Sequence, residues 1–192
     1  MRILMLGNSF TYFHNMPGTL AAMTGAEVVR HTRGGAYLSE HLNSNTELGA
    51  KTQAAFQEET WDYVVLQEMS SGPITAEKSF HQSIDALCAQ IRANGATPLL
   101  YATWAYQRGG EHLKRFGMDY DEMFRRLYEA YHAAAERNHC PIADVGERFY
   151  QPADSRELYF DDSCHPSPLG SQIAAEVIAQ AIKDDLKKHA TG

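Results

Sequence analysis

Short apolar runs alternate with amphipathic stretches along this chain of 192 residues, and this alternation restricts its fold more than any other feature. The runs at 2–6, 26–31, 61–66, 97–103 and 141–145 are typical of buried strands. Apolar residues at helical spacing follow at 16–23, 46–59, 80–94, 121–138 and from Ser167 onward. The pattern predicts βαβ units: an α/β fold with a central parallel sheet of about five strands and helices on both faces.

Composition narrows the class of protein. The length suits a single domain spanning 1–192, and 44% hydrophobic residues exclude disorder. A net charge of −7 without a basic run disfavours nucleic acid as a partner. We expect no membrane span, because no apolar run reaches about 18 residues, and no cleaved signal at the short apolar start. Three cysteines without a C-x-x-C pair favour reduced thiols and a cytoplasmic location.

Four segments are candidates for chemistry. In open parallel sheets, ligands bind beyond the carboxyl ends of the strands. Segments 7–11, 34–35 and 67–70 follow the first three predicted strands, and segment 161–167 precedes the last helix. We therefore expect the site to be assembled from these turns.

Ser9 is the candidate nucleophile in the first turn. A serine hydroxyl attacks only when a neighbouring base takes its proton, and that base is commonly a histidine held by a carboxylate. Only His165, among nine histidines, has an aspartate three residues earlier, Asp162, in a turn that a proline then ends. Two simpler interpretations remain open: Ser9 as a helix cap, and the Asp162–His165 segment as a surface turn.

These segments resemble blocks of a known family. Residues 7–10 (GNSF) resemble the G-D-S-L block of the SGNH (GDSL-like) hydrolase superfamily, and residues 162–167 (DSCHPS) resemble its D-x-x-H-P-S block. These two blocks, taken with V-V-L-Q-E at 64–68, are similar to the blocks of a bacterial branch of that superfamily. The resemblance implies a flavodoxin-like three-layer α/β/α fold. It also implies hydrolysis of acyl esters through an acyl-enzyme, without metal or cofactor, in which Ser9 is the nucleophile, His165 the base and Asp162 its orienting partner.

The resemblance also implies an oxyanion hole. Its backbone donors would be Ser9 and Gly35, with Gly34 a close alternative to Gly35. The family's usual Asn in the third block is missing here, and Gln67 is the candidate for its role. A Gln amide donates as an Asn amide does, on a longer arm.

Further residues could border the substrate. Asn8 adjoins the nucleophile, and Trp104 and Tyr106 follow the fourth predicted strand, at the start of a long irregular stretch at 104–120. Core packing is the alternative for both aromatic residues. Glu68 either orients Gln67, binds substrate or is a solvated loop acid.

Two other residues are weaker candidates. His14 could line the cleft, although an exposed position near a helix start is the simpler interpretation. Cys164 adjoins His165 and is best interpreted as a plain small residue. A zinc site from His14, Asp161, Cys164 and His165 lacks the spacing of known zinc motifs, so no metal is expected.

The sequence therefore predicts a serine esterase acting on a small-molecule or carbohydrate ester, with O-deacetylation as the narrower expectation. The alternative is a catalytically silent module that binds a glycan or a small acid in the same cleft. A metal-dependent hydrolase is a third possibility. The acyl group, the leaving group and the oligomeric state are left open by the sequence.

Overall fold

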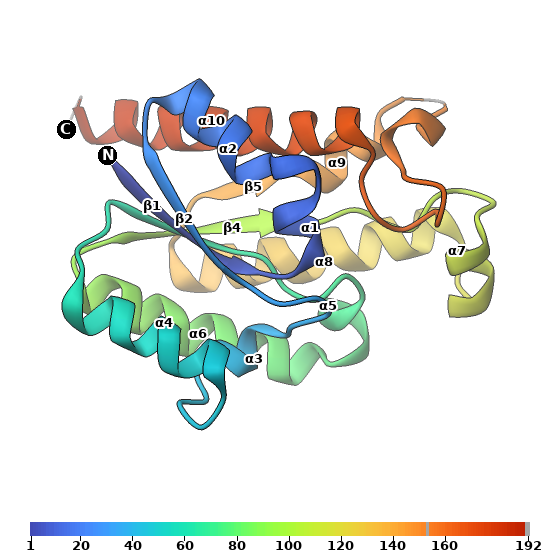
Figure 1. Ribbon diagram of the computed structural model, residues 1–192. Helices are drawn as coiled ribbons and strands as arrows, with labels where there is room; N and C mark the ends of the chain where they lie inside the picture. Colours follow the sequence, from blue (N-terminus) through green and yellow to red (C-terminus); the bar gives the residue numbers. More distant parts are fainter. Residues whose placement is uncertain (153, 191–192) are drawn as a thin grey trace.

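A computed structural model, which describes residues 1–152 and 154–190, contains a five-stranded sheet in the order β2-β1-β3-β4-β5 (Figure 1). Every neighbouring pair in it is parallel, as predicted. The strands are β1 (Arg2–Gly7), β2 (Glu27–Thr32), β3 (Tyr63–Leu66), β4 (Thr97–Ala102) and β5 (Ile142–Asp144). Each lies within or beside an apolar run of the sequence, so the alternation correctly predicted both the sheet and its parallel pairing.

Helices connect the strands and end the chain. The longer ones, at the predicted positions, are α2 (Met16–Thr24), α4 (Glu47–Glu58), α6 (Glu77–Ala93), α8 (Tyr120–Asn138) and α10 (Pro168–Ala190). Short helical segments that the periodicity did not predict are α1 (Ser9–Tyr12), η1 (Phe13–Asn15), α3 (Leu38–His41), α5 (Gly72–Thr75), α7 (Glu111–Phe116), α9 (Val145–Tyr150) and η2 (Arg156–Leu158). Within the described residues, no helix is long and apolar enough to cross a bilayer.

The sheet divides the core into two layers. Along β1, Ile3 and Met5 pack into the cluster beneath α2, α9 and α10, whereas Leu4 and Leu6 pack into the cluster beneath α4 and α6. This alternation follows from the two-residue period of a strand. Figure 1 shows the helices on opposite sides of the sheet, which gives the expected three-layer α/β/α arrangement.

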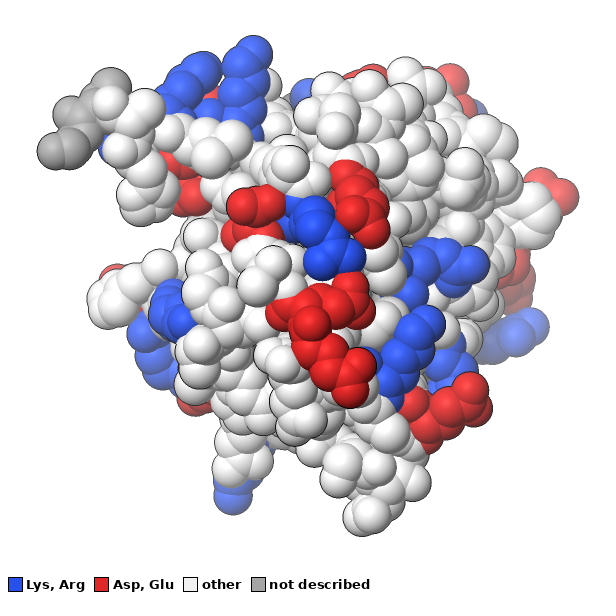
Figure 2. Space-filling model, turned by 60° about the vertical axis from the view of Figure 1, so that its left-hand side comes forward, with Lys and Arg blue, Asp and Glu red and all other residues white. Residues whose placement is uncertain are grey.

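Acidic and basic side chains are interspersed where the strands begin, on the face that Figure 2 brings forward. The Arg2 guanidinium bonds Glu27 at 2.9 Å and Glu59 at 2.7 Å, and it lies 4.3 Å from the centre of the Trp61 ring. The network joins β1 to β2 and to the segment before β3. These contacts fix the end of the sheet opposite to the carboxyl ends of its strands.

Two buried histidines, His31 of β2 and His41 of α3, lie beside Thr52 of α4. The Thr52 hydroxyl is 2.9 Å from His41 Nδ1 and 3.4 Å from His31 Nδ1. Burial lowers the pKa of both rings to about 4, because a charged imidazole loses its hydration there. The nearby Lys51 lowers the pKa of His31 further, and the neighbouring histidine lowers that of His41.

Acid should therefore destabilise this fold through these rings. Between about pH 6.5 and pH 4 the unfolded chain binds protons that the folded chain does not, so stability present at neutral pH is lost as the pH falls. We expect a loss of about 1 kcal/mol per histidine for each pH unit in this window. Urea unfolding at several pH values measures it, with His31→Gln/His41→Gln as the test variant and the exposed His139→Asn as the control. An unchanged pH slope in the double variant would show that the two rings do not carry the effect.

Candidate active site

The turn after β1 places Ser9 at the carboxyl edge of the sheet. The Asn8 side chain accepts the Phe10 N–H at 3.1 Å and so caps α1, which begins at Ser9. Gly7 is required before it, because a Cβ there would lie 2.5 Å from Thr11 Oγ1 and 2.6 Å from Gln67 Oε1. The first residues of the motif therefore form a turn with no room for a side chain at its start.

Ser9, His165 and Asp162 meet, although they come from opposite ends of the chain. Ser9 Oγ lies 2.8 Å from His165 Nε2, and His165 Nδ1 lies 2.5 Å from Asp162 Oδ2. The carboxylate can only accept, so Nδ1 carries the proton and Nε2 is free to accept one from Ser9. Burial opposes the charge on Asp162, but hydrogen bonds from His165 and from backbone N–H groups outweigh it and lower the pKa of Asp162.

The loop that carries His165 is held by its own aspartate. Asp162 Oδ1 accepts the N–H groups of Cys164 at 3.0 Å and His165 at 2.9 Å. Ser163, between Asp162 and Cys164, has a φ of 61°. This is the left-handed region, which a non-glycine residue enters only when its surroundings impose it. The spacing of the motif thus lets one carboxylate shape the turn and orient the imidazole.

The segment after β4 braces the same loop from outside. His112 Nδ1 lies 2.8 Å from the Asp162 carbonyl oxygen, and Gln107 N–H donates to the Ser163 carbonyl at 3.0 Å. The Trp104 indole N–H donates to the Cys164 carbonyl at 3.1 Å. Three successive carbonyls of the loop are therefore fixed by the 104–112 segment. His112 was not predicted, because nothing in its local sequence indicates a partner 50 residues away.

Two residues predicted to line the substrate do not do so. Trp104 is fully buried and stacks on Phe10 and Phe149 at 4.5 and 4.2 Å between ring centres. Asn8 is 2% exposed, and both ends of its amide bond to protein. Both side chains position the turns rather than contact a ligand. Tyr106 is 7% exposed, with its hydroxyl 2.9 Å from Ser70 Oγ, and its contact with substrate stays a prediction.

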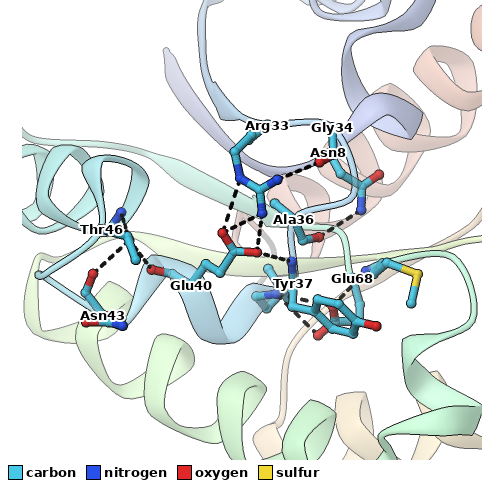
Figure 3. Close-up of polar contacts among 12 residues, drawn as sticks. Asn8, Arg33, Gly34, Ala36, Tyr37, Glu40, Asn43, Thr46 and Glu68 are labelled. Carbon is cyan, nitrogen blue, oxygen red and sulfur yellow. Dashed lines mark hydrogen bonds and ion pairs between the residues drawn. The ribbon is translucent and has the colours of Figure 1, made fainter.

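The turn at 33–36 lies beside Asn8, the residue before the nucleophile, as Figure 3 shows. Asn8 Nδ2 donates to the Ala36 carbonyl at 3.1 Å and joins the two turns. Within the described part of the chain, the N–H groups of Ser9, Gly34 and Gly35 have no hydrogen-bond acceptor. Gly35 has a φ of 68°, which suits glycine. These N–H groups are available to an oxyanion, and the choice between Gly34 and Gly35 stays open.

Gln67 is bonded to the nucleophile turn, and its role as a third oxyanion donor stays a prediction. Its Oε1 accepts the Asn8 N–H at 3.0 Å and the Thr11 hydroxyl at 2.9 Å, and its Nε2 donates to the Glu68 carbonyl. Exchanging the oxygen and nitrogen of the amide would set a donor against the Asn8 N–H, so the bonding pattern fixes the orientation. Gln67 is fully buried. It holds the nucleophile turn through Oε1, and its Nε2 uses one of two N–H groups on the Glu68 carbonyl.

Two acids brace the 33–38 turn. The Glu68 carboxyl accepts the N–H groups of Leu38 at 3.2 Å and Met69 at 2.7 Å. Burial raises the pKa of Glu68 to about 7, against the effect of these N–H groups. Glu40 pairs with Arg33 at 2.6 Å, and Arg33 also donates to the Gly34 carbonyl at 2.8 Å (Figure 3). Glu68 is therefore an internal brace, not a solvated loop acid.

Phe13 lies on the His165 ring. The ring centres are 4.4 Å apart and the planes differ by 15°. The next two residues, His14 and Asn15, both have left-handed backbones, with φ of 49° and 54°. His14 Nε2 lies 3.1 Å from the Pro166 carbonyl oxygen, so this kink contacts the histidine loop at two points. His14 was only an open candidate in the sequence, and Phe13 was not predicted.

The zinc alternative finds no support in the arrangement of side chains. Among residues 1–152 and 154–190, no three His, Cys, Asp or Glu side chains converge as metal ligands. Cys164 is buried, and burial together with the Asp162 charge raises the pKa of its thiol to about 12. It therefore remains a protonated, small apolar residue, as expected.

Removing the acceptor of Gln67 should destabilise the nucleophile turn. Gln67→Leu leaves the Asn8 N–H and the Thr11 hydroxyl buried without a partner, at about 1–3 kcal/mol each. We expect urea unfolding to show a loss of about 2–4 kcal/mol. The exposed Gln172→Leu is the control. A Gln67→Leu variant that kept its full stability would contradict the bracing role.

Comparisons with known proteins identify the family and the fold of the chain. Residues 5–173 match the GDSL-like Lipase/Acylhydrolase family. A protein from Slackia heliotrinireducens, described as an SGNH hydrolase, is 47% identical, with a TM-score of 0.92 over 95% of this chain and 98% of its own. A lipase/acylhydrolase from Enterococcus faecalis (16% identity, TM-score 0.69, 96% and 97% covered) and a DUF4886 family protein from Bacteroides uniformis (19%, 0.70, 94% and 82%) share the fold. No curated protein matches the sequence. The chain therefore belongs to the GDSL-like lipase/acylhydrolase family.

Proposed function

We propose that this protein is a serine esterase that cleaves carboxylic esters through an acyl-enzyme. The observation that carries the proposal is the continuous hydrogen-bonded line from Ser9 Oγ through the His165 ring to Asp162. This is the arrangement that activates a serine hydroxyl: a base within proton-transfer distance, held in the right tautomer by a half-buried carboxylate. Family membership supports the general class, an acylhydrolase.

The reaction follows from these positions. Ser9 Oγ attacks the ester carbonyl carbon while His165 Nε2 takes its proton. The carbonyl oxygen becomes negative and is stabilised by the N–H groups of Ser9 and of Gly34 or Gly35. His165 then returns the proton to the leaving alcohol, which departs from the acyl-enzyme. Water attacks the acyl group with His165 again as base, and the free acid leaves.

The oxyanion is stabilised by backbone donors in this proposal. One such donor typically contributes roughly 2.7–4 kcal/mol to transition-state stabilisation. Relatives usually have an Asn amide in the third block, and here Gln67 Nε2 donates one N–H to the Glu68 carbonyl and keeps a second. We propose small esters as the substrates, with O-deacetylation of a carbohydrate as the narrower proposal.

The same observation favours a second candidate. With the usual Asn of the third block absent, the cleft could bind a glycan or small acid without turning it over. Reactivity of Ser9 separates the two functions, because a binding module needs no activated nucleophile.

Ser9→Ala should abolish hydrolysis of 4-nitrophenyl acetate, with a fall in kcat of more than about 1000-fold, and should abolish labelling by a fluorophosphonate. Melting temperature measured on the same samples should be unchanged. Ser44→Ala, at an exposed serine in the turn before α4, is the control and should behave as the native protein. A native protein that neither reacts nor turns over would favour the binding module, and an active Ser9→Ala would remove Ser9 from the reaction.

His112→Ala should slow the reaction through the Asp162 loop. Losing one loop hydrogen bond of about 1 kcal/mol should lower kcat up to about tenfold while KM stays constant. His112→Asn should restore the rate, because Asn Nδ2 can donate from the position of His Nδ1. His132→Ala, which removes a histidine–aspartate contact outside the site, is the control. Equal rates for the Ala and Asn variants would show that the hydrogen bond is not the cause.

A further inference from the structure

The position of the leaving alcohol is fixed by the reaction just proposed, and the inference below rests on that function. His165 Nε2 takes the proton from Ser9 and must deliver it to the alcohol oxygen as the ester bond breaks. The alcohol part of the substrate therefore lies on the side of the cleft where the His165 ring is accessible. The groups around that ring are the ones that can select the alcohol.

Three rings form an aromatic rim on this side: Phe13, His14 and Phe160. Phe13 stacks on His165, and Phe160 meets Phe13 edge-on, with ring centres 6.4 Å apart. The ring centre of His14 is 6.3 Å from that of Phe160. Phe160 is 45% exposed, so much of its ring is open to a ligand.

The backbone at His14 and Asn15, beside these rings, has an unfavourable conformation. His14 and Asn15 are consecutive non-glycine residues with positive φ, a conformation that persists only where the surroundings impose it and that is common at binding sites. Phe160 is fixed to the catalytic loop, because its N–H donates to the His165 carbonyl at 2.8 Å. The rim is thus rigidly placed relative to the imidazole, as a binding surface must be.

The rim combines two chemical features. A half-exposed aromatic face attracts the C–H groups of a saturated or aromatic ring and excludes water from it. His14 Nε2 is at the Pro166 carbonyl, and within the described residues His14 Nδ1 has no partner. If Nε2 carries the proton, Nδ1 is an acceptor for a hydroxyl beside the rim.

We propose that the aromatic rim binds the alcohol part of the ester and selects alcohols that contain a ring, such as a pyranose. A ring with one apolar face and hydroxyls at its edge contacts Phe160 through the face and His14 through an edge hydroxyl. A linear alcohol of the same carbon number covers less of the Phe160 ring. The rim adds alcohol selectivity to a site whose nucleophile and base are common to the family.

Matched esters test this selectivity. Cyclohexyl acetate and n-hexyl acetate have the same acyl group and the same number of carbons, and methyl 6-O-acetylglucoside adds ring hydroxyls. In Phe160→Ala the preference in kcat/KM for the ring esters over the hexyl ester should fall about two- to tenfold, mainly through KM. Phe160→Tyr keeps the ring face and should keep the preference. Leu186→Ala, at an exposed apolar residue of the last helix, is the control.

A structural role for Phe160 gives a different result. If its ring only supports His165, Phe160→Ala lowers kcat for all three esters by the same factor, and the rim proposal fails while the esterase proposal stands. Binding of cyclohexyl acetate and the glucoside to Ser9→Ala and Ser9→Ala/Phe160→Ala, measured by NMR titration, separates the remaining cases. If the native protein turns over none of the three esters, ring binding that depends on Phe160 supports the rim and overturns the esterase. Ring binding unaffected by Phe160 overturns the rim.

Discussion

The indole of Trp104 connects the two ends of the chain that form the site. One face of it stacks on Phe10, which follows the nucleophile, at 4.5 Å, and its N–H bonds the carbonyl of Cys164, which precedes the imidazole, at 3.1 Å. Stacked aromatic rings bury a large apolar area, and a buried indole N–H needs a partner. One side chain at the end of β4 therefore fixes the backbone on both sides of the 2.8 Å contact between Ser9 and His165.

The sheet and the residues Ser9, His165 and Asp162 could be predicted because the sequence patterns that indicate them are local. Strand runs alternate with helical periodicity whatever the rest of the chain does. Asp162 and His165 lie in one turn, where the carboxylate shapes the backbone and receives the imidazole. That Ser9 lies opposite them follows from the resemblance, which joined two distant motifs.

The prediction that Trp104 lines the substrate was wrong, and the partners of Gln67 were not predicted, because both depend on tertiary contacts. The amide of Gln67 turns toward whatever buried donors lack an acceptor, and those donors, Asn8 N–H and the Thr11 hydroxyl, belong to a turn more than 50 residues away. An aromatic residue after a strand fits either a cleft or a core, and only the position of Phe149 decides for the core. His112 and Phe13 carry no local motif at all.

The same contacts separate the residue that orients the base from the residue that can select the alcohol. Phe13 touches the His165 ring directly, so any change to it alters the orientation of the base as well as the shape of the cleft. Phe160 meets Phe13 edge-on, lies beside His14 and is 45% exposed, while its backbone, not its ring, is hydrogen-bonded to the histidine loop. Its side chain can therefore vary without moving the imidazole. Among relatives that keep the Ser–His–Asp line, we expect differences in the alcohol accepted to arise at the position of Phe160 rather than at that of Phe13.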